Sequence, residues 1–148
     1  MTLEIYAAPT GSANRRTYTV PTLDVVSSAT LPAVPVVATY QVRQRDTLDF
    51  GIDFSGWLVV NGRTTVASAV WTVAVGSPKS PLAYSSVFEP TGLTVVLVTP
   101  GPLAVVGDVY WFDVTMVTAP ATLDCAQPGV VLPPRMRVLR LAVMVVAG

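Results

Sequence analysis

The sequence predicts an all-β fold, in the form of two sheets packed as a sandwich. Valine occurs 28 times in 148 residues, and 13 prolines and 10 glycines separate the short runs that contain it. β-branched side chains favour strands, whereas proline and glycine interrupt helices. No segment keeps the apolar spacing of an amphipathic helix over three turns without a proline or a β-branched cluster, so no helix is expected.

Residues 1–38 are expected to form an extended N-terminal arm. Four prolines lie there among alanine, threonine, serine and valine, and proline favours extended backbone. Val25, Val26, Val36 and Val37 make the stretch more apolar than a typical disordered tail. We therefore expect the arm to dock on a neighbouring subunit; a free terminus is the alternative.

Residues 39–148 are expected to form one sandwich domain. The clearest strand pattern is 48–54, where apolar side chains alternate with Asp49, Gly51 and Asp53, which are expected to face solvent or a partner. An apolar run at 57–60 then leads into the turn signal Asn61-Gly62. Further strands are expected at 40–43, 66–75, 84–88, 93–98, 109–117 and 136–145.

The apolar faces of these strands predict the core. The expected anchors are Phe50, Ile52, Phe54, Trp57, Trp71, Tyr110 and Phe112. Trp111 lies on the face opposite Tyr110 and Phe112, which makes it either a surface indole or, if the faces are reversed, a core one. Seven or eight short strands with frequent turns are typical of an immunoglobulin-like sandwich.

The composition indicates protein partners. Charged residues make up 12% of the chain, against about 25% in ordinary soluble domains. Hydrophobic residues reach 51% and the mean hydropathy is +0.57. We expect other chains to cover part of this apolar surface; the alternative is that serine and threonine supply enough surface polarity. Indoles and arginines are favoured at interfaces, so Trp111, Arg137 and Arg140 are candidate contact residues, with edge-strand protection as the other role for the arginines.

Nucleic acid and membranes are not expected partners. The formal net charge is zero, which gives no attraction to polyanions or to anionic lipids. The longest apolar run, 141–147, is shorter than the roughly 18–20 residues that a spanning helix needs. No secretory signal is recognised, so synthesis in the cytoplasm is expected.

The sequence predicts no enzyme, no cofactor and no metal site. It contains no histidine, and Cys125 is its single cysteine. Asp49 and Asp53, on one expected strand, lie about 13 Å apart, beyond the roughly 5–9.5 Å between paired glycosidase carboxylates. Asp46, Asp49 and Asp53 also lack the glycine-pivoted spacing of a calcium loop, so a solvated strand face is the preferred interpretation.

One stretch carries a more specific motif. It reads DTLDFGIDFSGWL over residues 46–58, then TVAS at 65–68 and VWTV at 70–73. This pattern resembles the small fibre–tail adaptor proteins of tailed bacteriophages, in which an alternating strand ends in Asp-(Phe/Trp)-Ser-x-Trp-Leu and a serine-containing segment leads into Trp-Thr-Val. The best-matching positions are Asp46, Asp53, Ser55, Trp57, Leu58, Ser68 and Trp71.

The resemblance implies an immunoglobulin-like virion protein that joins the tail, or its head-proximal part, to tail fibres. It implies contacts with a tail tube or adaptor ring, with a fibre, and with copies of the chain around a symmetry axis. It carries over no catalytic residues. The arm and the proline-rich segments 99–108 and 120–134 make this chain longer than compact members of the family.

Two other functions are compatible with the sequence. A capsid decoration or head-completion protein fits the composition equally well. A carbohydrate-binding or adhesion module would stack a sugar on Trp57 or Trp111, although no segment contains three expected exposed aromatic residues.

Overall fold

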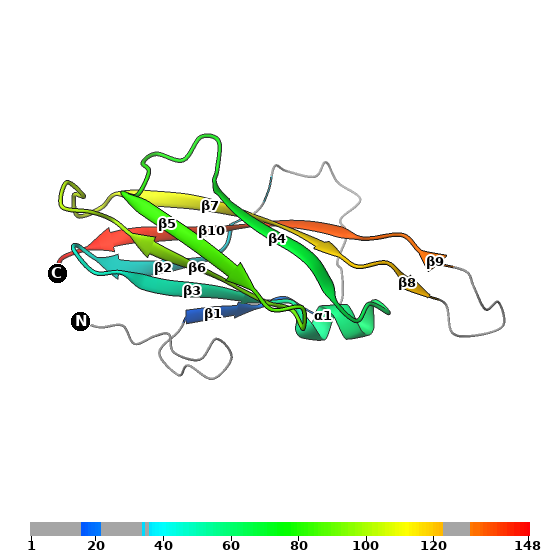
Figure 1. The fold of residues 1–148 in the computed structure, drawn as a ribbon. Helices are drawn as coiled ribbons and strands as arrows, with labels where there is room; N and C mark the ends of the chain where they lie inside the picture. The colour runs from blue at the N-terminus through cyan, green and yellow to red at the C-terminus, as the bar shows by residue number, and fades with distance from the viewer. Residues whose placement is uncertain (1–15, 22–33, 35, 123–130) are drawn as a thin grey trace.

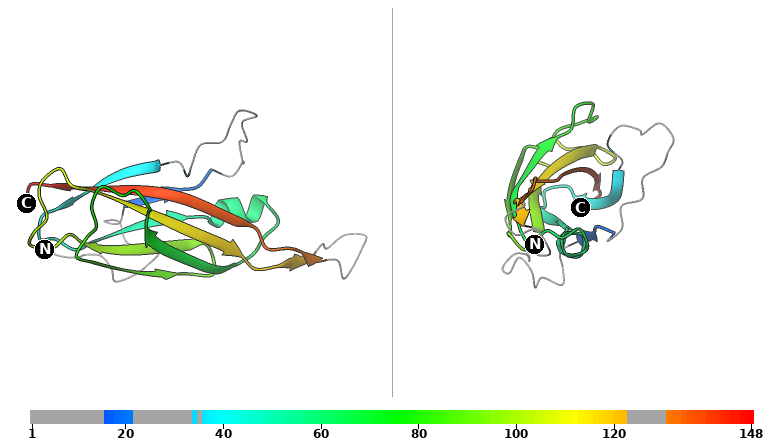
Figure 2. Two further views of the ribbon diagram at one scale, coloured as in Figure 1. Left: turned by 90° about the horizontal axis from the view of Figure 1, so that it is seen from above. Right: turned by 90° about the vertical axis from the view of Figure 1, so that its right-hand side faces the viewer.

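The chain folds as an all-β sandwich of two four-stranded sheets, as the sequence predicts (Figure 1). A computed structural model describes residues 16–21, 34, 36–122 and 131–148. Within these ranges the chain forms ten strands and one short helix. Figure 2 shows end-on how the two sheets curve around a common core.

The two sheets are built from strands far apart in the sequence. Sheet A has the order β1 (Arg16–Thr19), β3 (Leu48–Asp53), β6 (Leu93–Thr99) and β5 (Ala83–Phe88). Sheet B has the order β2 (Val36–Arg43), β10 (Met136–Val146), β7 (Val109–Thr118) and β4 (Val66–Val73). The β1–β3 and β2–β10 pairs are parallel, and the other pairs within the two sheets are antiparallel.

The core lies between the sheets and is filled by alternate residues of the long strands. On β7 every second side chain is buried, from Tyr110 to Thr118. All seven expected anchors are at most 4% exposed: Phe50, Ile52, Phe54, Trp57, Trp71, Tyr110 and Phe112. Trp71 of sheet B also donates from Nε1 to Thr94 Oγ1 of sheet A at 2.7 Å, so the indole that fills the core has its polar atom satisfied across it.

The prediction that the chain contains no helix is wrong. Residues Ser55–Val60 form α1, which covers one end of the sandwich (Figure 1). Asp53 begins the turn by accepting a hydrogen bond from the Ser55 amide at 2.8 Å. Trp57 and Leu58 point into the core while Val59 and Val60 are exposed. Six residues are too few to show a helical period, and apolar residues on both sides of the turn hide its amphipathic pattern.

The expected exposure of the polar face of β3 is also wrong at two positions. Asp49 is only 3% exposed and Gly51 is buried, whereas Asp53 is half-buried at the strand end. The physical reason is the position of β3 inside sheet A, between β1 and β6, whose backbones and side chains flank it on both sides.

Two parts of the expected arm are strands of the sandwich. Residues of β1 pair in parallel with β3, from Arg16 opposite Phe50 to Thr19 opposite Asp53. Val36 and Val37 begin β2, an edge strand of sheet B. Val20 continues from β1 into the core, and apart from Val20, Pro21 and Val34 the remaining arm residues, including Val25 and Val26, lie outside the described residues.

A narrow ribbon extends the sandwich beyond the end that carries α1. It consists of β8 (Ala121–Thr122) and β9 (Val131–Leu132), which continue from β7 and lead into β10 (Figures 1 and 2). This ribbon lies within the expected proline-rich excursion at 120–134. Cys125 lies in 123–130, outside the described residues.

Candidate protein-interface surfaces

The outer face of sheet B carries a tryptophan–arginine–aspartate cluster. Period-2 alternation turns Trp111 and Asp113 of β7 away from the core, and the register places Arg140 of β10 opposite Asp113. Arg140 Nε lies 2.7 Å from Asp113 Oδ1, and Nη2 lies 3.1 Å from Oδ2. The same guanidinium lies 5.2 Å from the centroid of the Trp111 ring. The cluster therefore combines a bidentate ion pair with a cation–π contact.

The two charges of this cluster, on Arg140 and Asp113, neutralise each other. The side-chain hydrogen bond with Asp113 raises the pKa of Arg140 above its ordinary value. Val70 and Met136, 55% and 65% exposed, lie on the same outer face, where they pair in register with Thr115 and Val117. This surface, which we call the Trp111 face, is thus mostly apolar with its charges paired.

The structure brings together only some of the predicted interface residues. Trp111 and Arg140 are in contact, and Val36 is exposed on β2, paired in register with Arg140. Val37 is half-buried and packs against the core. Arg137 lies on the inner side of β10, with its guanidinium 5.4 Å from the Trp57 ring centroid.

Arg137 belongs to an arginine group that holds the α1 end together. Arg135 lies on the same Trp57 ring at 4.9 Å and donates from Nη1 to Asn61 Oδ1. Arg63, which is 8% exposed, donates from Nη1 to Asn61 O at 2.9 Å and from Nη2 to Pro133 O at 3.0 Å. These hydrogen bonds connect the turn after α1 to the segment that enters β10, so the arginines stabilise this end of the fold.

A second candidate surface is strand β5, whose six residues are all exposed. Tyr84, Ser86 and Phe88 point to the inner side, as the edge contact of the Tyr84 and Phe112 rings at 5.3 Å shows. Inner side chains of a sandwich are normally buried, yet Tyr84 and Phe88 are 40% and 37% exposed. Sheet B therefore leaves part of the inner face of β5 exposed.

A third surface lies at the loop tips at the end of the sandwich opposite α1. Its exposed apolar residues are Val75, Leu82, Leu103, Val105 and Val106, and Leu103 is 92% exposed. Beside them is a cavity of about 310 Å³, lined mainly by Pro81, Leu82, Pro100, Pro102, Leu103 and Tyr110. An apolar, proline-lined hollow of this kind suits a side chain of a neighbouring protein.

The described ranges hold no group of three acidic or cysteine side chains placed to bind a metal ion. In the same part of the chain, no helix has the length and apolar character needed to cross a membrane.

Comparison with known proteins adds no relative: no protein-family model matches the chain, and no curated protein matches it.

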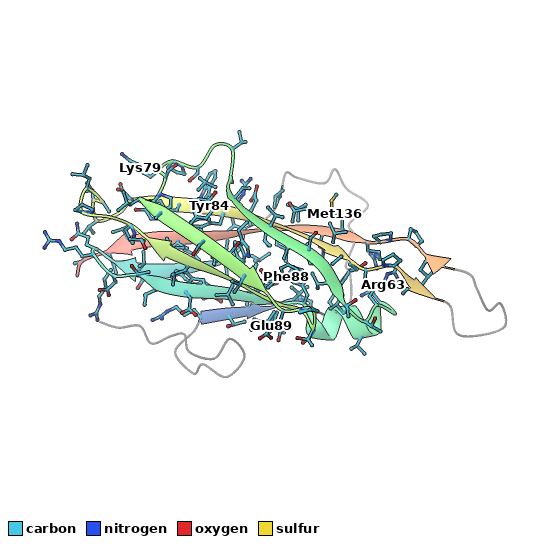
Figure 3. All side chains as sticks on the ribbon, in the orientation of Figure 1. Arg63, Lys79, Tyr84, Phe88, Glu89 and Met136 are labelled. Atoms are coloured by element: carbon cyan, nitrogen blue, oxygen red, sulfur yellow. The ribbon has the colours of Figure 1, made fainter. Side chains whose placement is uncertain are left out.

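The sequence places Trp111 on the face opposite Tyr110 and Phe112, where the structure has it, but it does not single out β5 as a surface. The available signal was the absence of charge between Lys79 and Glu89, which bracket the strand (Figure 3). The sequence shows Tyr84, Ser86 and Phe88 at alternate positions, which places them on one face of a strand. It does not show how far sheet B covers that face.

Proposed function

We propose that this protein is a structural, non-catalytic component of a tailed bacteriophage virion, an adaptor that joins the tail or its head-proximal part to tail fibres. The observation that carries the proposal is the apolar, charge-poor exterior of the sandwich: β5, the loop tips around Leu103 and the Trp111 face. A lone soluble domain has no use for three such surfaces, whereas a component of a packed assembly does.

Most of the motif behind the resemblance to fibre–tail adaptors lies near α1, whereas Asp46 lies in the turn between β2 and β3, at the other end of β3. Asp53 accepts a hydrogen bond from the Ser55 amide. Trp57 and Leu58 fill the core below α1. Trp71 donates a hydrogen bond to Thr94 of the other sheet. These residues stabilise one corner of a sandwich. The motif residues therefore support the fold, and the exposed surfaces are the proposed sites of contact with other virion proteins.

Mechanically, the adaptor acts as a rigid spacer with contact surfaces on different sides. The loop tips and α1 lie at opposite ends of the sandwich, so neighbours bound near each end are held apart by the length of the strands (Figure 1). Apolar contacts supply affinity. The charge pair of Arg140 and Asp113 on the Trp111 face restricts the orientation in which a partner can bind.

Capsid decoration or head completion remains the second candidate, because the same surfaces would serve it. Mass spectrometry of separated heads and tails distinguishes the two, with the chain expected in the tail fraction. A carbohydrate-binding role gains no support at the two candidate indoles. Trp57 is fully buried, and Arg140 covers one face of Trp111.

The proposal predicts that phage particles made without this protein have tails that lack fibres. The reason is that fibres have no other attachment surface if this chain bridges them to the tail. Negative-stain reconstruction of such particles measures fibre occupancy, and expression of the protein in trans is the control that restores it. Tails that carry all their fibres without the protein would remove the adaptor role.

A further inference from the structure

Strand β5 is an open sheet edge without the usual protection. It pairs with β6 on one side, and within the described part of the chain no strand pairs with its other side. Edge strands normally carry charge, proline or a bulge that discourages pairing with another chain. The β5 sequence AYSSVF has no charged residue and no proline, and its pairing with β6 is continuous from Ala83 to Phe88.

The free hydrogen-bonding groups of this edge can be assigned. Val87 O accepts from Thr94 Oγ1 of β6 at 3.2 Å, so the main-chain groups of Val87 face β6. Backbone groups alternate in direction along a strand, so those of Tyr84, Ser86 and Phe88 face the open side. These are the same three residues whose side chains lie on the exposed inner face.

Sheet B does not close this edge. Its own edge strand, β4, forms a hydrogen bond just beyond the C-terminal end of β5, where Val66 N donates to Pro90 O at 2.9 Å. Within β5 itself, Tyr84 and Phe88 keep more than a third of their surface exposed, and Val87 on the opposite face is 63% exposed. Tyr84 and Phe88 both lie along the visible length of β5 in Figure 3.

We propose that a second copy of this chain pairs its β5 antiparallel with this β5 about a two-fold axis, which joins the two A sheets into one continuous sheet. Isologous pairing needs a strand that is complementary to itself, and β5 meets the requirement in one register. With Ser86 on the axis, Ser86 faces Ser86 of the second copy and Tyr84 faces Phe88.

That register satisfies three independent conditions. It pairs all three outward-facing residues of each copy, which gives about six main-chain hydrogen bonds. It puts side chains of the same face opposite one another, since Tyr84, Ser86 and Phe88 all point inward. It sets an aromatic residue opposite an aromatic residue on each side of the axis, and it opposes no like charges.

The experiment uses the fact that residue 86 faces itself. Sedimentation equilibrium of the full chain over a wide concentration range is expected to show a monomer–dimer equilibrium. Ser86→Lys and Ser86→Asp each place two like charges on the axis and are expected to raise the dimer dissociation constant at least about tenfold. An equimolar mixture of the two variants is expected to regain dimers, because Lys then faces Asp.

Two controls keep the result specific. Thr72→Lys adds the same charge at an exposed position of β4, the neighbouring edge strand, and is expected to leave the dimer unchanged. Ser86 is exposed and its amide is not used in the β5–β6 ladder, so the variants should fold, which circular dichroism verifies. Deletion of residues 1–15, all outside the described strands, is also expected to preserve the dimer.

Each contrary result overturns the proposal. A wild-type chain that stays monomeric at every concentration, or a Ser86→Lys variant that dimerises as the wild type does, shows that β5 is not the contact. Failure of the mixture to regain dimers shows that Ser86 is not on the axis. Loss of the dimer on deletion of 1–15 assigns the contact to the N-terminal segment of a neighbour. The inference does not depend on the adaptor role, since it concerns the isolated protein.

Discussion

Replacement of Trp57 by alanine is expected to lower the free energy of unfolding by about 3–5 kcal/mol. Trp57 is the largest fully buried side chain, and it is placed under the sandwich end by a helix of only six residues. The guanidinium groups of Arg135 and Arg137 lie within 5.4 Å of its ring centroid. Removal of the indole leaves a cavity and takes the packing surface away from both arginines. A loss of this size is a large part of the about 5–15 kcal/mol that stabilises a typical domain.

Urea unfolding followed by circular dichroism measures this loss. Val59→Ala is the matched control, because Val59 is in the same helix but is 76% exposed, and its change is expected to stay within about 0.5 kcal/mol. Equal effects of the two substitutions would show that α1 does not anchor the core.

Replacement of Gly92 by alanine is expected to cost about 2–4 kcal/mol, the second large effect. Gly92 has a φ of +127°, where a side chain is strained. A Cβ atom there would lie 2.7 Å from Ser55 N and 2.9 Å from Ser55 Cα. Gly92 O also accepts from Phe54 N at 2.9 Å, so the turn between β5 and β6 is fixed directly against the start of α1.

The control for this prediction is Gly62→Ala. Gly62 also has a positive φ, +70°, but a Cβ atom there meets nothing within 4 Å. It should therefore show only the backbone cost of about 1–2 kcal/mol. Thermal and urea unfolding of both variants separate strain from steric contact. If Gly92→Ala is no more destabilising than Gly62→Ala, the close approach of the turn to α1 is not structurally important.

The strands with strict alternation were predictable from the sequence. In β7, every second side chain from Tyr110 to Met116 is buried, and Trp111 lies on the opposite, outer face. Period-2 alternation determines which side of a sheet each residue faces, so the contact of Trp111 with a residue on the outer side of β10 follows from the same pattern. The sequence does not reveal that Arg140 is the one that meets it, because the register between β7 and β10 depends on long-range pairing.

The features that were not predictable depend on tertiary context. The run at 57–60 is apolar throughout, and its helical form follows from Asp53 bonding Ser55 and from Trp57 filling the end of the core. Asp49 is buried because β3 became an inner strand of sheet A. β5 is exposed because sheet B does not extend over it. This depends on the order of strands in the two sheets, which the local sequence pattern does not indicate.

The central claim is that neighbouring proteins cover the apolar exterior of this sandwich in a phage particle. Hydroxyl-radical footprinting of the free protein and of the purified particle tests it directly, with Leu103 and Met136 as reporters on two surfaces and the fully buried Met116 as the internal reference. We predict strong labelling of Leu103 and Met136 in the free protein and labelling near the level of Met116 in the particle. Equal labelling in both states, or absence of the chain from the particle, would contradict the account.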